Sequence, residues 1–255
     1  MAGSAEPTSA PPGAPSAAAE PVPPEPPDIG LAPQPAPPPA VRSGPAPGAG
    51  RIWLDDRSWV DVSRGWLGRA AIVYDALVEQ VAWRQSRVFR YERWVDEPRL
   101  SAWCDPGRGA LAHPVLLDVH RAVRAAYKPF GGFGMAWYRD ERDGVAWHRD
   151  RDLRWTEDTV VALLVLGARR PFLLRPRSNR FDHGAPAGGA VHDLAPGDGD
   201  LIVLGGRAQA DWEHSVPKLA HRVGGRISLQ WRWTSRAGRP ERGAGYSAPR
   251  TFSSR

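Results

Sequence analysis

The sequence predicts an α+β fold that is mainly β: an antiparallel double-stranded β-helix (jelly roll) with supporting N-terminal helices and a disordered N-terminal tail. Three observations predict it. The first 50 residues hold 16 of the 27 prolines and no aromatic residue. Two amphipathic stretches follow, and after Gly131 the chain carries short apolar runs separated by glycine and proline clusters. Helices followed by many short strands with turn signals are typical of a jelly roll with helical support.

Residues 1–50 are predicted to be a disordered tail. Proline, alanine, glycine and serine dominate this segment, so it has too little apolar surface to offset the entropy of ordering, and we expect local polyproline II structure. Arg42 is its only basic residue, and proline interrupts it throughout, so it does not have the pattern of a signal peptide. We expect no membrane span, because the chain has no uninterrupted apolar stretch of about 18 residues.

Residues 51–236 are predicted to form one globular domain, followed by a flexible C-terminal tail at residues 237–255. All 12 tryptophans lie after residue 50, in a segment long enough for one well-buried core. Cys104 is the only cysteine, which excludes an intrachain disulfide and a cysteine-rich zinc site. We therefore expect a reducing compartment, the cytoplasm. We also expect a monomer.

The chain after residue 50 carries an excess of positive charge. It contains 33 Lys and Arg residues against 24 Asp and Glu residues, a formal net charge of +9. Positive charge favours anionic partners such as nucleic acids. A genome biased toward arginine explains the same excess, so charge alone does not establish nucleic-acid binding.

Two helices are predicted before the strands. Apolar residues recur three and four positions apart at residues 67–80, and again at residues 114–127, where a proline stands at a tolerated first-turn position. Later segments rich in β-branched and apolar residues predict strands at residues 160–166, 172–175, 190–194, 201–204 and 226–233.

Between the two helices, residues 84–104 interleave arginines with aromatic residues, in a pattern closer to short strands than to a helix. Arginine and aromatic side chains together suit phosphate contacts and base stacking. A solvated strand pair with a few buried rings explains the pattern equally well. The residues concerned are Arg84, Arg87, Arg90, Arg93, Arg99, Phe89, Tyr91, Trp94 and Trp103.

His148, Arg149 and Asp150 form an HxD triplet, whose outer residues project to the same side of a strand and can bind one ion. His214 is the candidate third ligand, because the strand at residues 201–204 precedes it and the returning chain can bring it beside the pair. Two imidazoles and one carboxylate leave coordination positions open, as Fe(II) oxygenases require. His183 and His192 compete for the third position, although their Gly- and Pro-rich surroundings favour surface loops.

The strand predicted at residues 226–232 alternates polar and apolar residues, which places Arg226, Ser228, Gln230 and Arg232 on one face. Two inward arginines need anionic partners to offset their desolvation. A dicarboxylate co-substrate supplies them, because the guanidinium fork pairs with a carboxylate through two parallel hydrogen bonds. An edge strand with its polar face in water is the alternative.

Five ordered blocks resemble the AlkB-like 2-oxoglutarate and Fe(II)-dependent dioxygenases. They read MAWYRDERDGVAWHRDRD, LGARRPFLLRPR, GDLIVLGG, DWEHSVP and GRISLQWR. Their order and spacing also agree with the family. The likeness covers about residues 51–234 and is strongest from Tyr138 onward.

This resemblance implies His148, Asp150 and His214 as catalytic iron ligands, Fe(II) as the metal, and 2-oxoglutarate and O2 as co-substrates. It implies that Arg226 pairs with the distal carboxylate of 2-oxoglutarate and that Arg232 lies near its metal-bound end. Residues 84–104 match the family's nucleotide-recognition lid. The remaining residues implied are Tyr138 and Ser228 for the co-substrate, and Arg87, Arg90, Arg99, Trp103 and Trp147 for the substrate, with Trp147 and Trp212 flanking the ligand histidines.

Three positions depart from the family pattern. Ala136 stands where an asparagine is common, which removes a polar side chain from the implied co-substrate pocket. Ser228 also replaces an asparagine, and Cys104 stands where related nucleic-acid demethylases often have tyrosine. The iron ligands are unaffected, but these changes weaken any transfer of substrate identity.

The resemblance implies oxidative demethylation of alkylated DNA or RNA bases, a DNA-repair type of reaction in which an N-methyl carbon is hydroxylated and lost as formaldehyde. The damaged base must leave the stack to enter the pocket. A hydroxylase or demethylase of a protein or a small molecule is the alternative within the same chemistry. A non-catalytic binding module is the third hypothesis.

Overall fold

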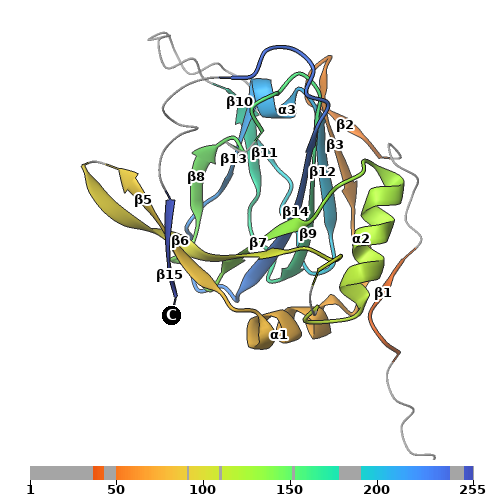
Figure 1. The fold of residues 1–255 in the computed structure, drawn as a ribbon, viewed down its shortest axis with the longest axis vertical. Coiled ribbons are helices and arrows are strands. Elements are labelled where there is room, and N and C mark those ends of the chain that lie inside the picture. The colour runs from red at the N-terminus through yellow and green to blue at the C-terminus, as the bar shows by residue number, and fades with distance from the viewer. Residues whose placement is uncertain are drawn as a thin grey trace, which may run out of the picture. The chain divides into compact units, whose positions relative to one another are not determined.

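The computed structural model of the chain describes residues 37–42, 50–90, 92–108, 111–150, 153–177, 191–241 and 250–254. The domain that begins at Pro38 is mainly antiparallel β (Figure 1). Its elements are β1 (Ala40–Val41), β2 (Ile52–Trp53), β3 (Ser58–Ser63), β4 (Leu67–Gly68), α1 (Ala70–Gln80), β5 (Arg84–Arg90), β6 (Arg93–Cys104), α2 (Val115–Ala126), β7 (Phe133–Tyr138), β8 (Val145–His148), β9 (Thr159–Gly167), β10 (Leu173–Pro176), β11 (His192–Asp193), β12 (Leu201–Gly206), α3 (Ala208–Asp211), β13 (Trp212–Val216), β14 (Arg226–Thr234) and β15 (Arg250–Ser254).

Strands β7 to β14 form a jelly roll. The large sheet has the order β15-β5-β6-β7-β14-β9-β12-β3-β2, and the small sheet has the order β11-β10-β13-β8. From β7 onward the chain alternates between the two sheets, with β7, β9, β12 and β14 in the large one and β8, β10, β11 and β13 in the small one. The predicted fold class is confirmed.

The large sheet has an apolar core on each face. Nearly every residue of β9 is buried, which is the pattern of a strand covered on both sides. Its alternate residues Val160, Ala162, Leu164 and Leu166 join the core that includes residues of α1 and α2. Val161 and Leu163 join the second core, which also contains small-sheet residues. The small sheet thus covers the face of the large sheet opposite the helices.

Both predicted helices are present, with shorter bounds. The first begins at Ala70, because Leu67–Gly68 pairs with β1 as strand β4. The second spans Val115–Ala126 and buries one apolar face, including Val119 and Val123. Among the described residues, no helix is long and apolar enough to cross a membrane.

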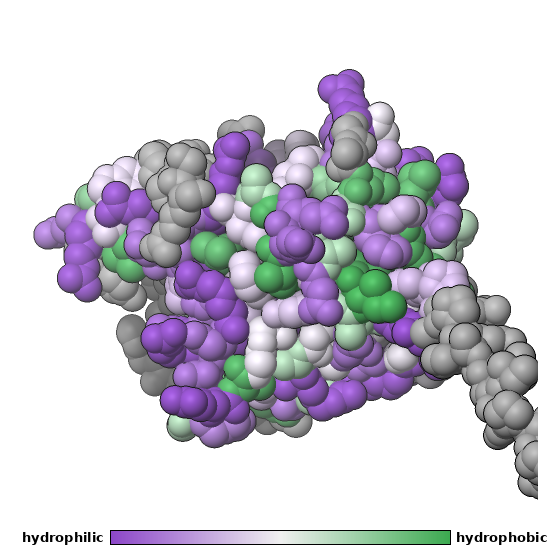
Figure 2. All heavy atoms as spheres, turned by 90° about the horizontal axis from the view of Figure 1, so that it is seen from below, coloured by the Kyte–Doolittle hydropathy of each residue, from purple (hydrophilic) through white to green (hydrophobic). Residues whose placement is uncertain are grey.

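Strands β5 and β6 pair as a hairpin, which extends away from the jelly roll in Figure 1. Strand β6 continues the large sheet by pairing with β7, from Leu100↔Trp137 to Cys104↔Phe133. The strand interpretation of this segment is therefore confirmed. Figure 2 shows the face seen from below Figure 1, where hydrophobic side chains form separate patches between hydrophilic ones.

Two predicted tails include ordered strands. Ala40–Val41 pairs with β4, and Val41 packs against the helix-side core, so the predicted disorder is wrong for these residues. Arg250–Ser254 pairs with β5, so the predicted C-terminal tail is wrong for this strand. Residues 1–36 and 43–49, the larger part of the predicted N-terminal tail, lie outside the described residues.

Candidate metal centre and polar cavity

His148, Asp150 and His214 form a compact cluster. Their potential ligand atoms all lie within 4.8 Å of one another. His148 ends β8 and faces His214 on β13 directly across the small sheet, with 4.3 Å between the ring centroids. Asp150 follows two residues after the end of β8. The structure therefore brings together the three residues that the sequence singled out.

Burial keeps both imidazoles neutral. Burial lowers the pKa of His214 to about 3, with a further contribution from the neighbouring His148. The pKa of His148 is also lowered, again chiefly by burial. Nδ1 of His148 lies 2.8 Å from the carbonyl oxygen of Ala146 and can donate to it, which leaves Nε2 unprotonated. Neutral imidazole is the form that binds a metal ion.

Asp150 is held as a buried carboxylate. Burial raises its pKa, but Arg232 and the two histidines outweigh this effect, and the pKa lies well below its usual range. Nη2 of Arg232 donates to its Oδ1 over 3.0 Å. The main-chain N–H of Asp150 donates to Oε1 of Gln209 over 2.9 Å. Two imidazoles and one carboxylate at this spacing can hold a divalent transition metal with coordination positions left open.

The cluster opens into a cavity of about 110 Å³ lined by the polar face of β14. Arg226, Ser228, Gln230 and Arg232 all contribute to its wall, as their alternation along the strand predicted. The alternative of an edge strand in water is wrong, because β14 lies between β7 and β9 in the large sheet.

Arg226 is the residue of this cavity whose unpaired donors indicate a ligand. Its side chain is 1% exposed, and burial lowers its pKa to about 10. Among the described residues, Nε and Nη1 have no hydrogen-bond partner. Leaving buried donors of a guanidinium unpaired is costly, so the cavity is suited to an anion that pairs with them.

Two further predicted residues lie beside Arg226. Tyr138 on β7 is directly opposite Arg226 in the strand register, and Ser228 is opposite Ala136. Both polar side chains are 1% exposed. The hydroxyl of Tyr138 accepts a hydrogen bond from Nη1 of Arg99 over 3.5 Å. Ala136 thus leaves this part of β7 apolar beside the polar face of β14.

A second cavity of about 630 Å³ adjoins the first beneath the β5–β6 hairpin. Glu97, Arg99, Gln230 and Arg232 line both cavities. Trp103, whose side chain is 67% exposed, forms part of the wall of the second cavity.

The other predicted substrate residues have different positions. Trp147 lines the cavity beside the metal cluster, with the guanidinium of Arg175 4.2 Å from its ring centroid. Arg87 is exposed on the hairpin, where it pairs with Asp96, and it lines neither cavity. The side chain of Arg90 lies outside the described part of the chain.

Of the competing histidines, His192 is not part of the cluster among the described residues. His192 lies on β11, with its ring 5.7 Å from that of Trp212. His183 lies outside the described residues. Trp212 is buried in the core between the sheets, and its Nε1 donates to Asp55 over 2.6 Å, so it does not line the cavity beside the cluster.

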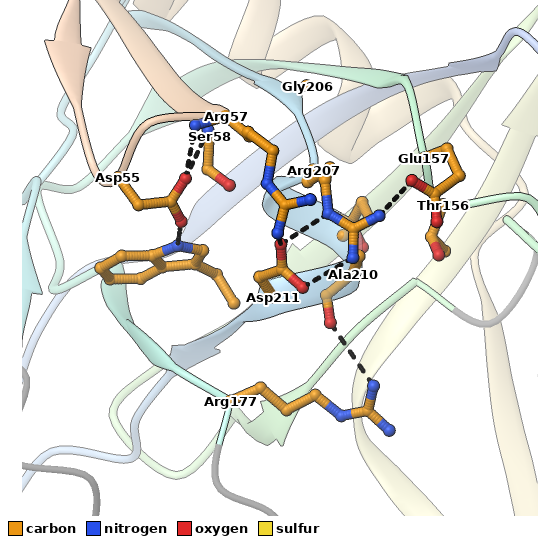
Figure 3. A network of polar contacts seen from close by, with 12 residues as sticks. Asp55, Arg57, Ser58, Thr156, Glu157, Arg177, Gly206, Arg207, Ala210 and Asp211 are labelled. Atoms are coloured by element: carbon orange, nitrogen blue, oxygen red, sulfur yellow. Dashed lines mark hydrogen bonds and ion pairs between the residues drawn. The ribbon is translucent and has the colours of Figure 1, made fainter.

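Sequence reasoning missed two neighbours of the cluster. The ring of Phe172 stacks on His214 at 5.5 Å. Gln209, which is 1% exposed, lies on the short helix α3. A polar network fixes this helix: Arg207 donates to Asp211 over 2.7 and 3.0 Å and also bonds Glu157 (Figure 3). Contacts between segments this far apart leave no periodic signal in the sequence.

The comparisons with known proteins agree with this geometry. Residues 121–232 match the model of the 2OG-Fe(II) oxygenase superfamily. The chain is 30% identical over 177 residues to alpha-ketoglutarate-dependent dioxygenase alkB homolog 3 of Bos taurus, covering 65% of this chain and 62% of the relative. The human alkB homolog 3 is 28% identical over 171 residues, covering 63% of this chain and 60% of the relative. The chain thus spans about three-fifths of the length of these relatives.

A DNA oxidative demethylase ALKBH2 from Arabidopsis thaliana is 29% identical over 109 residues, covering 37% of this chain and 35% of its own length. A solved prolyl hydroxylase from Trichoplax adhaerens aligns with 68% of this chain and 83% of its own, at 15% identity and a TM-score of 0.47.

The jelly roll, its His-Asp-His cluster and the match of residues 121–232 together support one class, the 2OG-Fe(II) oxygenases. Within that class, the similarity to alkB homolog 3 supports an AlkB-like oxygenase. The resemblance inferred from the sequence blocks is thereby confirmed.

Proposed function

We propose that this chain is a 2-oxoglutarate and Fe(II)-dependent dioxygenase that removes methyl groups from alkylated bases of DNA or RNA. The observation that carries the proposal is the union of two features in one cavity. A triad of His148, Asp150 and His214 suits Fe(II), and the buried Arg226 beside it has donors without partners among the described residues.

Each residue has a defined part in this proposal. His148, Asp150 and His214 hold the metal, and Arg226 pairs with the distal carboxylate of 2-oxoglutarate. Tyr138 and Ser228 face the co-substrate from neighbouring strands. Arg232 lies near the metal-bound end of 2-oxoglutarate and orients Asp150. Bound Fe(II) would supply the oxidation by O2. 2-Oxoglutarate is converted to succinate and CO2. One oxygen atom of O2 enters succinate, and the other enters the substrate. A hydroxylated N-methyl group then leaves as formaldehyde.

The second cavity supports a base as the substrate. It adjoins the metal cavity, and Trp103 offers an aromatic surface on which a base removed from its stack can lie. Arg84, Arg99 and Arg232 line the same cavity and suit the phosphates or the polar edge of a nucleotide. Phe89 and Trp94 lie on the same hairpin, 51% and 38% exposed, in an edge-to-face pair at 5.6 Å.

We further propose that the protein acts as a monomer in the cytoplasm. The support for the compartment is the single cysteine, Cys104, which suits a reducing environment.

A substrate panel tests this proposal. The full chain is incubated with Fe(II), 2-oxoglutarate and O2, and with methylated single-stranded DNA, methylated RNA, a methylated peptide or small amines, while formaldehyde and base mass are measured. We expect formaldehyde from at least one nucleic acid and none with Asp150→Ala. Turnover of only the peptide or the amines would overturn the substrate assignment while leaving the oxygenase chemistry intact.

A further inference from the structure

The metal ligand Asp150 is not held by a strand. Strand β8 ends at His148, so the ladder that fixes His148 opposite His214 does not extend to Asp150. The position of the carboxylate therefore depends on side-chain contacts of the turn that carries it.

Arg149, between the two ligands, is tied to a residue 92 positions away. Its Nη1 and Nη2 donate to the two carboxylate oxygens of Glu241 over 2.7 and 2.8 Å. The side chain of Arg149 is only 17% exposed, and that of Glu241 is 28% exposed. The bidentate, partly buried geometry gives a stronger and more directional contact than an exposed ion pair.

Glu241 also bonds the chain beyond Asp150. Its Oε1 accepts from Oγ1 of Thr156 over 3.2 Å, and its main-chain N–H donates to the carbonyl of Arg154 over 2.7 Å. Glu241 therefore holds both the residue before Asp150 and residues that follow it. The sequence placed Glu241 in a flexible tail, and this prediction is wrong for this residue because it is bonded to the metal-site turn.

Gln209 holds the same turn from the other side. Its Oε1 accepts from the N–H of Asp150 over 2.9 Å, and its main-chain carbonyl accepts from Nη1 of Arg149 over 3.1 Å. The network in Figure 3 fixes the helix that carries Gln209 through Arg207 and Asp211. The turn is thus held between α3 and the segment that contains Glu241.

We propose that Glu241 is a positioning residue of the metal centre, which acts through Arg149, together with Gln209, to hold Asp150 at its ligand position. This inference rests on the proposed metal site. Residues that orient metal ligands typically contribute about 10- to 100-fold to metal affinity. The segment after the jelly roll thereby becomes part of the metal site.

Metal affinity measured without turnover tests this role. The metal-free full chain is titrated with Mn(II), free Mn(II) is followed by electron paramagnetic resonance, and the melting temperature of each metal-free variant is recorded. We expect the Kd for Mn(II) to rise about 10- to 100-fold in Glu241→Ala and by less in Glu241→Gln, because an amide retains one acceptor. Glu241→Gln carries the test if Glu241→Ala does not fold.

Two further variants separate positioning from general stability. Arg51→Ala removes another bidentate, partly buried pair, in which Nε and Nη2 of Arg51 donate to Asp61 over 2.9 and 3.0 Å. This pair lines neither cavity, so the variant should leave the Kd unchanged. The exchange Arg149→Glu with Glu241→Arg should recover part of the affinity lost by either substitution alone.

The contrary results are distinct. An unchanged Kd in a folded Glu241 variant, or an equal rise in Arg51→Ala, would overturn the positioning role. A wild-type chain that binds no Mn(II) would instead overturn the proposed metal site, and the inference with it.

Discussion

The two faces of β14 differ in what they contribute. On the helix side, Ile227, Leu229 and Trp231 are fully buried in the apolar core. On the other side, Arg226, Ser228, Gln230 and Arg232 line the cavity beside the metal cluster. Strand alternation separates them, so one nine-residue segment carries stability on one face and chemistry on the other. Substitutions on the two faces should therefore have different consequences.

The largest effect on activity should come from replacing Asp150, whose carboxylate is oriented by Arg232 on the polar face. Asp150→Ala removes a metal ligand and the partner of Arg232. We expect succinate formation to fall by about 100- to 1,000-fold, the scale on which loss of one electrostatic stabiliser of the transition state is measured. Succinate is quantified by mass spectrometry with Fe(II) and 2-oxoglutarate, and the melting temperature serves as the control. Retained turnover would remove the basis for assigning chemistry to this face.

On the apolar face, Trp231→Ala should destabilise the fold while sparing the site. Trp231 is fully buried, and its Nε1 donates to Nδ1 of His120 over 3.0 Å. A large-to-small change in a packed core costs about 3–5 kcal/mol. Urea unfolding measures this loss, and Mn(II) affinity of the folded fraction should stay at the wild-type value. A selective loss of Mn(II) affinity with unchanged stability would contradict the separation of the two faces.

A conservative change should show what the polar face recognises. Arg226→Lys retains the charge but loses the bidentate fork, so we expect the Kd of 2-oxoglutarate to rise about 10- to 100-fold, equivalent to roughly 1.4–2.7 kcal/mol. Isothermal titration of the Mn(II)-loaded protein gives this value. Mn(II) affinity itself should be unaffected, and equal 2-oxoglutarate binding by the variant would place the distal carboxylate elsewhere.

The exposed hairpin should give the smallest effect. Arg87 and Asp96 are about half exposed, and exposed ion pairs contribute about 0–1 kcal/mol. Arg87→Ala should therefore change the unfolding free energy by less than about 1 kcal/mol and reduce the salt dependence of oligonucleotide binding by about one charge. Fluorescence anisotropy at several salt concentrations measures the second quantity. An unchanged salt dependence would argue against a phosphate contact at Arg87.

Periodic features were predictable from the sequence. Alternation along residues 226–232 placed the polar face, and the HxD triplet paired His148 with Asp150, because both depend on local spacing. His214 lies 66 residues beyond His148, and the family resemblance selected it. The contacts of Arg149 with Glu241 and of Asp150 with Gln209 join residues 92 and 59 positions apart. No local pattern marks such pairs, and the composition of the C-terminal segment suggested only a tail. Strand β1 was missed for a similar reason, since two residues beside prolines show no period.

The most direct test of the account is the binding of 2-oxoglutarate to the full chain with and without Mn(II), measured by isothermal titration. If His148, Asp150 and His214 share one cavity with Arg226, the co-substrate should bind at least about tenfold more tightly to the metal-loaded protein, a coupling of about 1.4 kcal/mol. Equal affinity with and without metal, or no binding in either state, would contradict the account.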